Sequence, residues 1–374
     1  MTGHLCADIN QGALLAAPPF LVVYSGFSYT DVSLLVFASN IVSAIVQPLF
    51  GYWGDKVSRP WFMAAGIALA GLGMCGIGLF QDYALIMVSA MVSGLGVALF
   101  HPEGGRLANL VAGEQKNSGM SIFAVGGKLG FCVGPLMAAA SLSAWGMAGT
   151  VVFLVPSLGC ALVFLSKNRR FRAFDQESER NAASIVMVDH WGAFSLVMGA
   201  LSARSILYYA LTAFIPLFLI AELGQNEGVS STMITVFALA GAFATLMSGY
   251  TARRVQVKRL MIGAYALTAV LIALFAVCRI LPLSIVLIIA LALVVDISYP
   301  SSVALGQSFV PNHLGMASGL SFGVVVCVGG IASPFLGMAG DAVGLTPVML
   351  VLVGVALVAS LISCFVPSSV KRRA

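Results

Sequence analysis

The sequence predicts an all-α membrane protein with twelve transmembrane helices arranged as two pseudo-symmetric six-helix bundles. Hydrophobic residues make up 60% of the 374 residues and charged residues only 9%, with a mean hydropathy of +1.01. Because a soluble domain has about a quarter charged residues, lipid must be the solvent of this chain. The apolar residues form twelve runs of spanning length, and the first six runs resemble the last six.

Each predicted span is an apolar run of about 20 residues or more, bounded by Gly, Pro or charged residues. The first set of spans lies at 3–24, 31–53, 60–81, 83–111, 118–141 and 145–166. The second set lies at 191–222, 229–251, 259–280, 283–310, 314–339 and 344–367. No basic stretch precedes the first run, which favours a span over a cleavable signal peptide.

One long polar stretch divides the chain. Residues 167–190 are predicted to be a cytoplasmic linker between an N-terminal bundle, 1–166, and a C-terminal bundle, 191–374. Fifteen Lys and Arg residues follow even-numbered spans or lie at the C-terminus, whereas only Arg279 lies on the other side. Because basic loops stay in the cytoplasm, both termini are predicted to be cytoplasmic, in the cell inner (plasma) membrane.

The two sets of spans repeat with a shift of 198 residues. Matching positions are Gly51 and Gly249, Lys56 and Arg254, and Pro102 and Pro300. Because each copy has six spans, the copies are parallel, related by an axis along the membrane normal. Such repeats place a substrate site between the two halves, near the middle of the membrane.

Two sequence motifs carry a family resemblance. Residues 51–59, GYWGDKVSR, resemble the loop motif G-x-x-x-D-[RK]-x-x-R that follows the second span in the major facilitator superfamily. Residues 99–108, LFHPEGGRLA, resemble the fosmidomycin-resistance branch of that superfamily, together with His4 and Asp8 in the first span and SIFAVGG at 121–127. The resemblance covers nearly the whole chain.

The resemblance implies the major facilitator fold and a proton-coupled antiporter that expels small molecules. In the named case the substrate is an anionic antibiotic, so the resemblance implies efflux and antibiotic resistance. It also implies a conformational switch at Gly51, Asp55, Lys56 and Arg59. A plain cytoplasmic anchor would explain the bases of this motif but not its Gly and Asp. In the second copy Arg253 replaces the Asp.

Ionisable residues inside the spans are informative, because each is costly there unless it is paired or faces water. The acids are Asp8, Glu103 and Asp296, and the bases are Arg106, Lys128 and Arg204. Three acids and three bases suggest pairing, although the sequence does not say which residues meet.

The acids, with His4, are the predicted proton-coupling residues: Glu103, Asp8, Asp296 and His4. Glu103 is the first choice, because Pro102 removes a helical hydrogen bond beside it. The alternative is a structural salt bridge to Arg106, three residues on, or to Lys128. Asp8 shares a helix face with His4 and with either Gln11 or Gly12.

The bases are predicted to bind substrate. Arg106, Lys128 and Arg204 would form a cationic patch for a carboxylate or phosphonate, and Lys128 stands where related sequences carry Asn. Alternatively the three bases neutralise the three acids. Further substrate-binding candidates are Tyr208, one turn after Arg204, Tyr299, close to Asp296, and His101, which lies about 160° around the helix from Glu103.

Together these features predict a secondary active transporter, most favourably an exporter of a small drug or metabolite in exchange for protons, with an anionic compound as one candidate. The alternative is a proton symporter or facilitator for uptake. The sequence lacks a G-x-x-x-x-G-K-[ST] loop for ATP. An enzyme, a cofactor, a metal site and a nucleic-acid partner are not predicted; the expected partners are a small-molecule substrate, protons and the lipid bilayer, and the expected state is a monomer.

Overall fold

The computed structural model describes residues 1–57, 59–174 and 188–368, and every regular element in them is a helix, as predicted. Most of the predicted linker, residues 175–187, lies outside the described residues. The chain divides into two compact units. Unit 1 consists of Met1–Gly113, Ile122–Met187 and Asn312–Val324, and unit 2 consists of Glu114–Ser121, Val188–Pro311 and Val325–Ala374.

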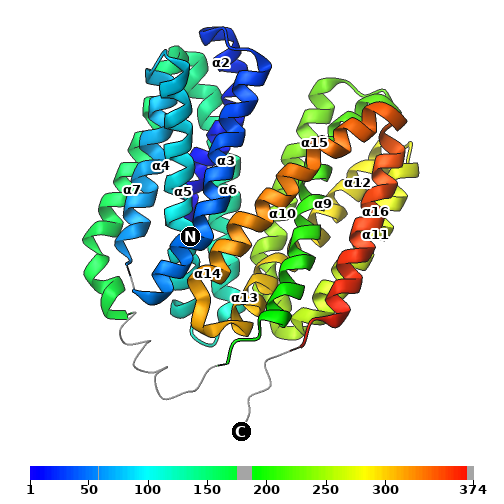
Figure 1. The fold of residues 1–374 in the computed structure, drawn as a ribbon. Coiled ribbons are helices and arrows are strands. Elements are labelled where there is room, and N and C mark those ends of the chain that lie inside the picture. Colours follow the sequence, from blue (N-terminus) through cyan, green and yellow to red (C-terminus); the bar gives the residue numbers. More distant parts are fainter. Residues whose placement is uncertain (58, 175–187, 369–374) are drawn as a thin grey trace. The chain divides into compact units, whose positions relative to one another are not determined.

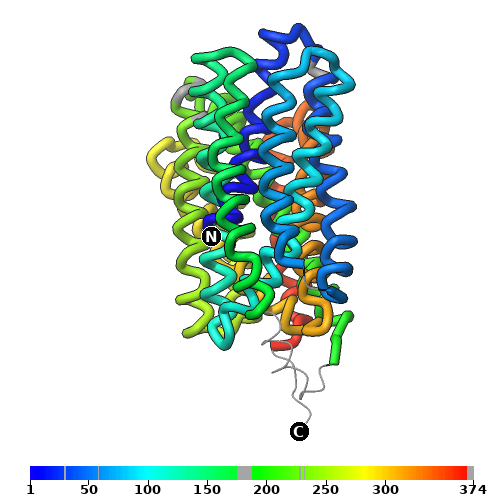
Figure 2. The backbone as a smooth tube through the Cα atoms, turned by 90° about the vertical axis from the view of Figure 1, so that its left-hand side faces the viewer, coloured from blue at the N-terminus to red at the C-terminus, as the bar shows by residue number. Residues whose placement is uncertain are grey.

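Unit 1 is built from the first half of the sequence and one short segment of the second half (Figures 1 and 2). Its helices are α1 (Thr2–Ala16), α2 (Pro18–Ser25), α3 (Tyr29–Lys56), α4 (Trp61–Leu79), α5 (Tyr83–Val111), most of α6 (Lys116–Trp145), η1 (Gly146–Phe153), α7 (Leu154–Ser166), α14 (Leu314–Gly319) and the π-helical turn η3 (Leu320–Val324). The short η2 (Pro311–His313) leads into α14.

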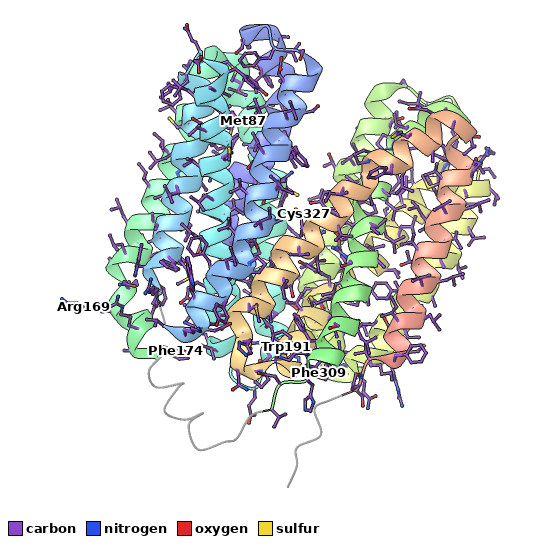
Figure 3. The ribbon with its side chains drawn as sticks, in the orientation of Figure 1. Met87, Arg169, Phe174, Trp191, Phe309 and Cys327 are labelled. Carbon is purple, nitrogen blue, oxygen red and sulfur yellow. The ribbon has the colours of Figure 1, made fainter. Side chains whose placement is uncertain are left out.

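Unit 2 is built from the second half of the sequence and the first turns of α6. Its other helices are α9 (Trp191–Leu223), α10 (Glu227–Arg254), α11 (Val257–Val277), α12 (Leu281–Ile297), α13 (Tyr299–Phe309), α15 (Val325–Val343) and α16 (Leu345–Phe365). At one end of the unit, the N–H of His190 donates to the carbonyl of Phe309 over 2.6 Å, beside Trp191 (Figure 3).

The described residues contain twelve membrane spans. Ten helical stretches are long and apolar enough to cross a membrane, and α1 with α2, bent by 52°, makes an eleventh. One of the ten, residues 116–166, is 51 residues long, about twice what a span needs, and turns at Gly146, where φ is 58°. It therefore holds two spans, and the prediction of twelve transmembrane helices is confirmed.

Polar side chains cap several spans where the apolar runs begin. The Ser28 hydroxyl accepts the N–H of Asp31 over 3.1 Å at the start of α3, and the Asp31 carboxylate accepts the N–H of Ser28. Asp82 caps α5 in the same way, by accepting the N–H of Leu85. These caps satisfy backbone donors that a helix leaves free in its first turn.

The outer faces of the helices carry large apolar side chains. Leu136, Val155 and Met338 are each at least two-thirds exposed to the surroundings of the chain. Figure 3 shows such side chains along the length of the helices. A water-soluble protein does not expose apolar surface on this scale, so the pattern fits helices whose outer faces contact lipid.

Two spans are interrupted in ways that the spacing of apolar residues does not show. The tenth span breaks at Ser298, because Pro300 in the first turn of α13 lacks the N–H that would continue α12. The eleventh span contains the π-helical turn η3, and unit membership changes immediately after it, between Val324 and Val325. By contrast, α5 continues as one helix through Pro102.

Candidate functional site

Glycines on α6 allow the backbones of α1 and α6 to pack closely against each other. A Cβ atom on Gly130 would lie 2.7 Å from the Cβ of Asp8 and 2.8 Å from the carbonyl oxygen of Leu5. A Cβ on Gly134 would overlap the carbonyl oxygen of Ile9. Small residues allow such close helix packing in membranes. This contact brings the polar face of α1 against α5 and α6.

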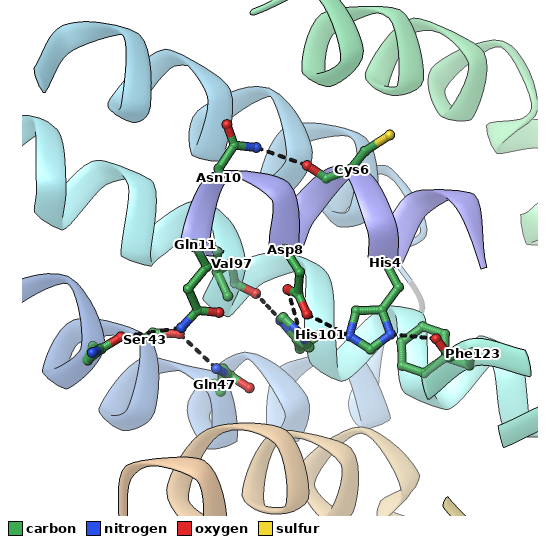
Figure 4. Close-up of polar contacts among 11 residues, drawn as sticks. His4, Cys6, Asp8, Asn10, Gln11, Ser43, Gln47, Val97, His101 and Phe123 are labelled. Carbon is green, nitrogen blue, oxygen red and sulfur yellow. Dashed lines mark hydrogen bonds and ion pairs between the residues drawn. The ribbon is translucent and has the colours of Figure 1, made fainter. Parts of the chain in front are cut away.

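On that face, three ionisable side chains meet in what we call the His4–Asp8–His101 cluster (Figure 4). The Nε2 of His4 lies 3.2 Å from Oδ2 of Asp8, and the Nε2 of His101 lies 3.3 Å from Oδ1. The two Nε2 atoms are 3.1 Å apart. The three residues are 4%, 3% and 4% exposed, so the cluster is buried. The i, i+4 pairing of His4 and Asp8 follows the prediction, whereas His101 joins from α5.

Backbone carbonyl groups orient both imidazole rings. The Nδ1 of His4 lies 2.7 Å from the carbonyl oxygen of Phe123, and the Nδ1 of His101 lies 2.9 Å from that of Val97. The His4 ring also stacks on the Phe123 ring, with a centroid distance of 4.1 Å. Both Nε2 atoms are thereby held toward Asp8.

The cluster also has the spacing of metal ligands, since one ligand atom from each residue lies within 4.8 Å of the others. A divalent cation on one carboxylate and two neutral imidazoles would leave net positive charge in a buried site. A single added proton would leave the site neutral, which burial favours. Burial therefore favours an added proton over a divalent metal ion at this cluster, and the absence of a resident metal stays a prediction.

Glu103 and Arg106 pair with each other on α5. The Arg106 Nε donates to Oε2 of Glu103 over 3.1 Å, and Nη2 donates to Oε1 over 2.9 Å. This two-pronged bond between buried groups is the salt bridge that the sequence offered as the alternative role of Glu103. Oε2 lies 3.2 Å from where a Cβ of Gly54 would be, so the pair lies beside the loop motif.

Asp55 of the loop motif binds the start of α14. Its two carboxylate oxygens accept the N–H of Gly315 over 2.6 Å and the N–H of Met316 over 2.9 Å. Gly51, one turn earlier, has no room for a side chain, because a Cβ there would overlap the carbonyl oxygen of Gly315. The Gly and the Asp of the motif therefore serve one helix contact within unit 1.

The bases of the loop motif make other contacts. The ammonium group of Lys56 lies 4.3 Å from the ring centre of Tyr52, and the guanidinium group of Arg59 lies 5.7 Å from that of Phe62. Both side chains therefore rest on aromatic rings close by in the sequence. This placement fits an anchor role for the two bases, beside the helix contact made by Asp55.

The repeat copy of the motif retains the glycine contact. A Cβ on Gly249 in α10 would lie 2.6 Å from the Cα of Ser118, in the first turns of α6. Gly249 thus approaches the start of a helix in unit 2 as Gly51 does in unit 1. Arg253, which replaces the Asp, cannot accept backbone N–H groups.

In unit 2, Arg204 of α9 bonds to the buried carboxylate of Asp296 on α12, and its Nε donates to the carbonyl of Val295 over 3.3 Å. The guanidinium group lies 4.3 Å from the ring centre of Tyr299 and 4.9 Å from that of Tyr208. The structure thus brings Asp296, a predicted proton-coupling residue, together with three predicted substrate-binding residues: Arg204, Tyr208 and Tyr299. They form an ion pair enclosed by aromatic rings.

Lys128, the sixth ionisable residue inside the spans, follows Gly127 on α6 and is partly exposed. Its neighbour Gly127 faces the cluster, because a Cβ there would lie 2.6 Å from Nε2 of His4 and 2.7 Å from Oδ2 of Asp8. The three predicted cationic residues therefore differ in setting. Arg106 and Arg204 each bond to an acid, and Lys128 lies at the edge of a glycine-lined helix contact.

Sequence reasoning missed a polar face on α3. Gln11 continues the face of His4 and Asp8, and its amide donates to Asn40 over 3.3 Å. On α3 the Gln47 amide donates to Ser43 over 2.8 Å (Figure 4). Asn40, Ser43 and Gln47 recur at helical spacing in an apolar span, which is the signal that would have shown them.

Comparison with known proteins agrees with the motifs. The sequence model of the Major Facilitator Superfamily matches residues 1–334. The uncharacterized MFS-type transporter YfnC of Bacillus subtilis (strain 168) is 29% identical over 366 residues, covering 93% of this chain and 87% of that protein. The fosmidomycin resistance protein of Escherichia coli (strain K12) is 24% identical over 350 residues, covering 90% and 84%.

Solved structures share the fold. The fucose:proton symporter FucP of E. coli superposes with a TM-score of 0.75 at 13% identity, covering 98% of each chain. The proton:xylose symporter XylE gives a TM-score of 0.75 at 14% identity, covering 98% of this chain and 94% of that one. The predicted fold, family and non-enzymatic class are confirmed. The chain is a multi-pass membrane protein that belongs to the Major Facilitator Superfamily of small-molecule transporters.

Proposed function

We propose that this chain exports a small drug or metabolite in exchange for protons, by alternating access. One observation carries the proposal, namely the different partners of the three buried acids. Glu103 and Asp296 bond to Arg side chains, which stay protonated at physiological pH. Asp8 contacts two imidazoles, and imidazole is the side chain that titrates near neutral pH. Proton exchange is therefore assigned to Asp8, His4 and His101.

This assignment changes the order of the predicted proton-coupling residues. Glu103 stood first on sequence grounds, but its bond to Arg106 supports the structural alternative. Asp296 has a similar partner in Arg204. Breaking either pair would leave a buried charge alone at a cost of about 3–5 kcal/mol, so neither acid suits repeated protonation as well as Asp8.

The substrate is proposed to be small, with an anion as the first candidate. Lys128 supports this choice as a cation at a partly exposed position inside a span. Arg106 and Arg204 bond to acids, which favours neutralisation over a three-base patch. We assign Tyr208 and Tyr299 to the positioning of Arg204, and direct substrate contact to Lys128 and the polar face of α3.

Asp55 and Gly51 are proposed to form the conformational switch. Their contact with the start of α14 is short and depends on two hydrogen bonds, so it can form and break as a unit. Lys56 and Arg59 are proposed to hold this end of the helices at the cytoplasmic surface. Both termini are then cytoplasmic, and we propose a monomer as the working state.

The direction of transport rests on the resemblance to the fosmidomycin resistance protein. The alternative is proton symport, the activity named for FucP and XylE, but a likeness at 13–14% identity carries only the fold. Transport of radiolabelled fosmidomycin into proteoliposomes, with the pH gradient imposed in either direction, distinguishes the two. If the chain exchanges substrate for protons, fosmidomycin should accumulate when the vesicle interior is the more acidic side and protons flow out. If it is a symporter, fosmidomycin should accumulate when the exterior is the more acidic side and protons flow in.

Asp8→Asn and Glu103→Gln are matched variants for the same assay, since each replaces a buried acid with its amide. We expect Asp8→Asn to abolish gradient-driven accumulation while substrate exchange without a gradient continues. Glu103→Gln should keep its response to the gradient. Gradient-driven accumulation in Asp8→Asn at the wild-type level would refute the assignment.

A further inference from the structure

We infer that the His4–Asp8–His101 cluster, in the arrangement seen here, holds one proton more than two neutral imidazoles and one carboxylate carry, and that this proton lies between the two Nε2 atoms. The inference deepens the proposed function and rests on it only for the role of that proton in transport. The proton itself follows from hydrogen-bond geometry.

The first step concerns the Nδ1 atoms. Each lies within hydrogen-bond distance of a backbone carbonyl oxygen, 2.7 Å for His4 and 2.9 Å for His101. A carbonyl oxygen only accepts, so each Nδ1 must carry the hydrogen. A neutral imidazole has a hydrogen on only one of its nitrogens. If both rings were neutral, both Nε2 atoms would bear bare lone pairs.

The second step concerns the Nε2 atoms. They face each other at 3.1 Å, and each also faces an oxygen of Asp8, at 3.2 Å and 3.3 Å. Without a further proton, four acceptor atoms would meet here with no hydrogen between them. One proton on either Nε2 converts the repulsive contact into an N–H···N bond. It also places an imidazolium next to the carboxylate, a charge-assisted arrangement.

The third step concerns charge. With one added proton the cluster is neutral, which suits three buried side chains. Without it the cluster carries one negative charge, and with a second proton one positive charge. Among the groups around it, Glu103 and Arg106 on α5 neutralise each other. The other ionisable groups on α1 and the helices around it, within the described residues, are the amino group of Met1, Cys6 on α1, Tyr24 on α2, Cys75 on α4, Tyr83 on α5, Lys116, Lys128 and Cys132 on α6, Cys160 on α7, and Asp31, Tyr52, Asp55 and Lys56 on α3.

Packed side chains enclose most of the cluster, and one side of His4 lines a cavity of about 170 Å³ whose other walls include Phe100 and Phe164. The Phe322 ring of η3 lies 5.9 Å, centroid to centroid, from the rings of both His4 and His101. Gly127 closes the side toward α6, where even a methyl group would collide with His4 and Asp8. A cluster that has lost its proton therefore carries a net charge on side chains that are at most 4% exposed, until the helices move apart. Proton loading and burial of the cluster are coupled for this reason.

The coupling suits an exchanger. The loaded cluster can be buried, whereas the unloaded cluster needs water or a cation beside it. An exporter that works by exchange must release its proton and take it up again at different stages of the cycle. A site that tolerates burial only when protonated links each stage to a different arrangement of α1, α5 and η3.

The test is solid-state NMR of the reconstituted wild-type chain with ¹⁵N-labelled histidine at pH 7, recorded before and after a metal chelator is added. His190→Gln with His313→Gln removes the other two histidine signals and serves as the assignment variant. We expect two protonated Nδ1 atoms and one proton shared by the two Nε2 atoms, that is, one imidazolium per chain. In Asp8→Asn the imidazolium signal should be lost.

Three results would overturn the inference: two neutral rings, a proton on Nε2 with a bare Nδ1 in either ring, or metal-shifted signals that change when chelator is added. The NMR result and the flux result are independent. A shared proton without gradient-driven transport would refute the proposed function alone, and gradient-driven transport with two neutral rings would refute this inference alone.

Discussion

Replacing Asp55 by Asn should loosen the start of α14 by a predictable amount. The carboxylate accepts two backbone N–H groups, at 2.6 Å and 2.9 Å. A hydrogen bond to a charged group contributes about 1.5–3 kcal/mol. The amide of Asn keeps one acceptor oxygen, loses the second and loses the charge. We therefore expect the contact to weaken by about 2–3 kcal/mol, which is roughly a 30- to 150-fold change in its opening equilibrium.

Hydrogen exchange of a peptide that contains Gly315 and Met316 measures this opening directly. Exchange of these two amides in Asp55→Asn should be faster by the same factor. Lys56→Gln is the matched control, because it changes the neighbouring charge and keeps the carboxylate. Asp82→Asn is a second control, since Asp82 accepts only one N–H, from Leu85 at the start of α5, and the amide oxygen of Asn can still accept it.

An unchanged exchange rate at Gly315 and Met316 in a folded Asp55→Asn protein would refute the reasoning. It would mean that packing at Gly51, and not the carboxylate, holds α14 in place. Faster exchange spread over all of unit 1 would refute it as well, because the hydrogen bonds act only on the first turn of α14.

Three further predictions concern stability and substrate choice. Arg204→Gln should lower the stability toward thermal unfolding in detergent by about 3–5 kcal/mol, and adding Asp296→Asn should recover much of the loss, because the buried carboxylate is then no longer charged. Gly130→Ala should lower the unfolding temperature by forcing α6 away from α1, whereas Gly159→Ala, where a Cβ meets nothing within 4 Å, should leave it unchanged or raise it. Lys128→Asn should lower the transport of anionic relative to neutral compounds, and identical substrate profiles would contradict direct contact.

The spans could be predicted from the sequence because hydropathy depends on local composition. The predicted span at 83–111 coincides with α5, and the last span, predicted at 344–367, is α16 at Leu345–Phe365. The breaks within spans could not be placed so well. The π-helical turn at Leu320–Val324 has ordinary apolar composition. Its position is set by contact with α3, where Gly323 lies against the side chain of Gln47.

The site was predictable only where its residues are close in sequence. His4 with Asp8 and Glu103 with Arg106 lie one helical turn apart, and both pairs were named from spacing. The bond between Arg204 and Asp296 joins positions 92 residues apart, and only the equal number of acids and bases suggested a pair. His101 was named as a substrate-binding candidate, on a different side of α5 from Glu103. In the structure His101 faces Asp8 of α1. Helix spacing gives the side of α5 on which a residue lies, whereas the helix that packs against that side is determined by tertiary contacts.

Comparing the two copies of the loop motif separates the residue needed for close helix packing from the residue needed for its charge. Gly51 and Gly249 each lie against the first turns of another helix, where neither has room for a side chain. Both copies therefore keep the steric requirement. Only Asp55 accepts backbone N–H groups there, because Arg253 has donors and no acceptor. Of the two copies of the motif, as the described residues show them, only the copy in unit 1 has these two hydrogen bonds. A charge change at Asp55 should therefore alter conformational balance, whereas a neutral residue at 253 should not.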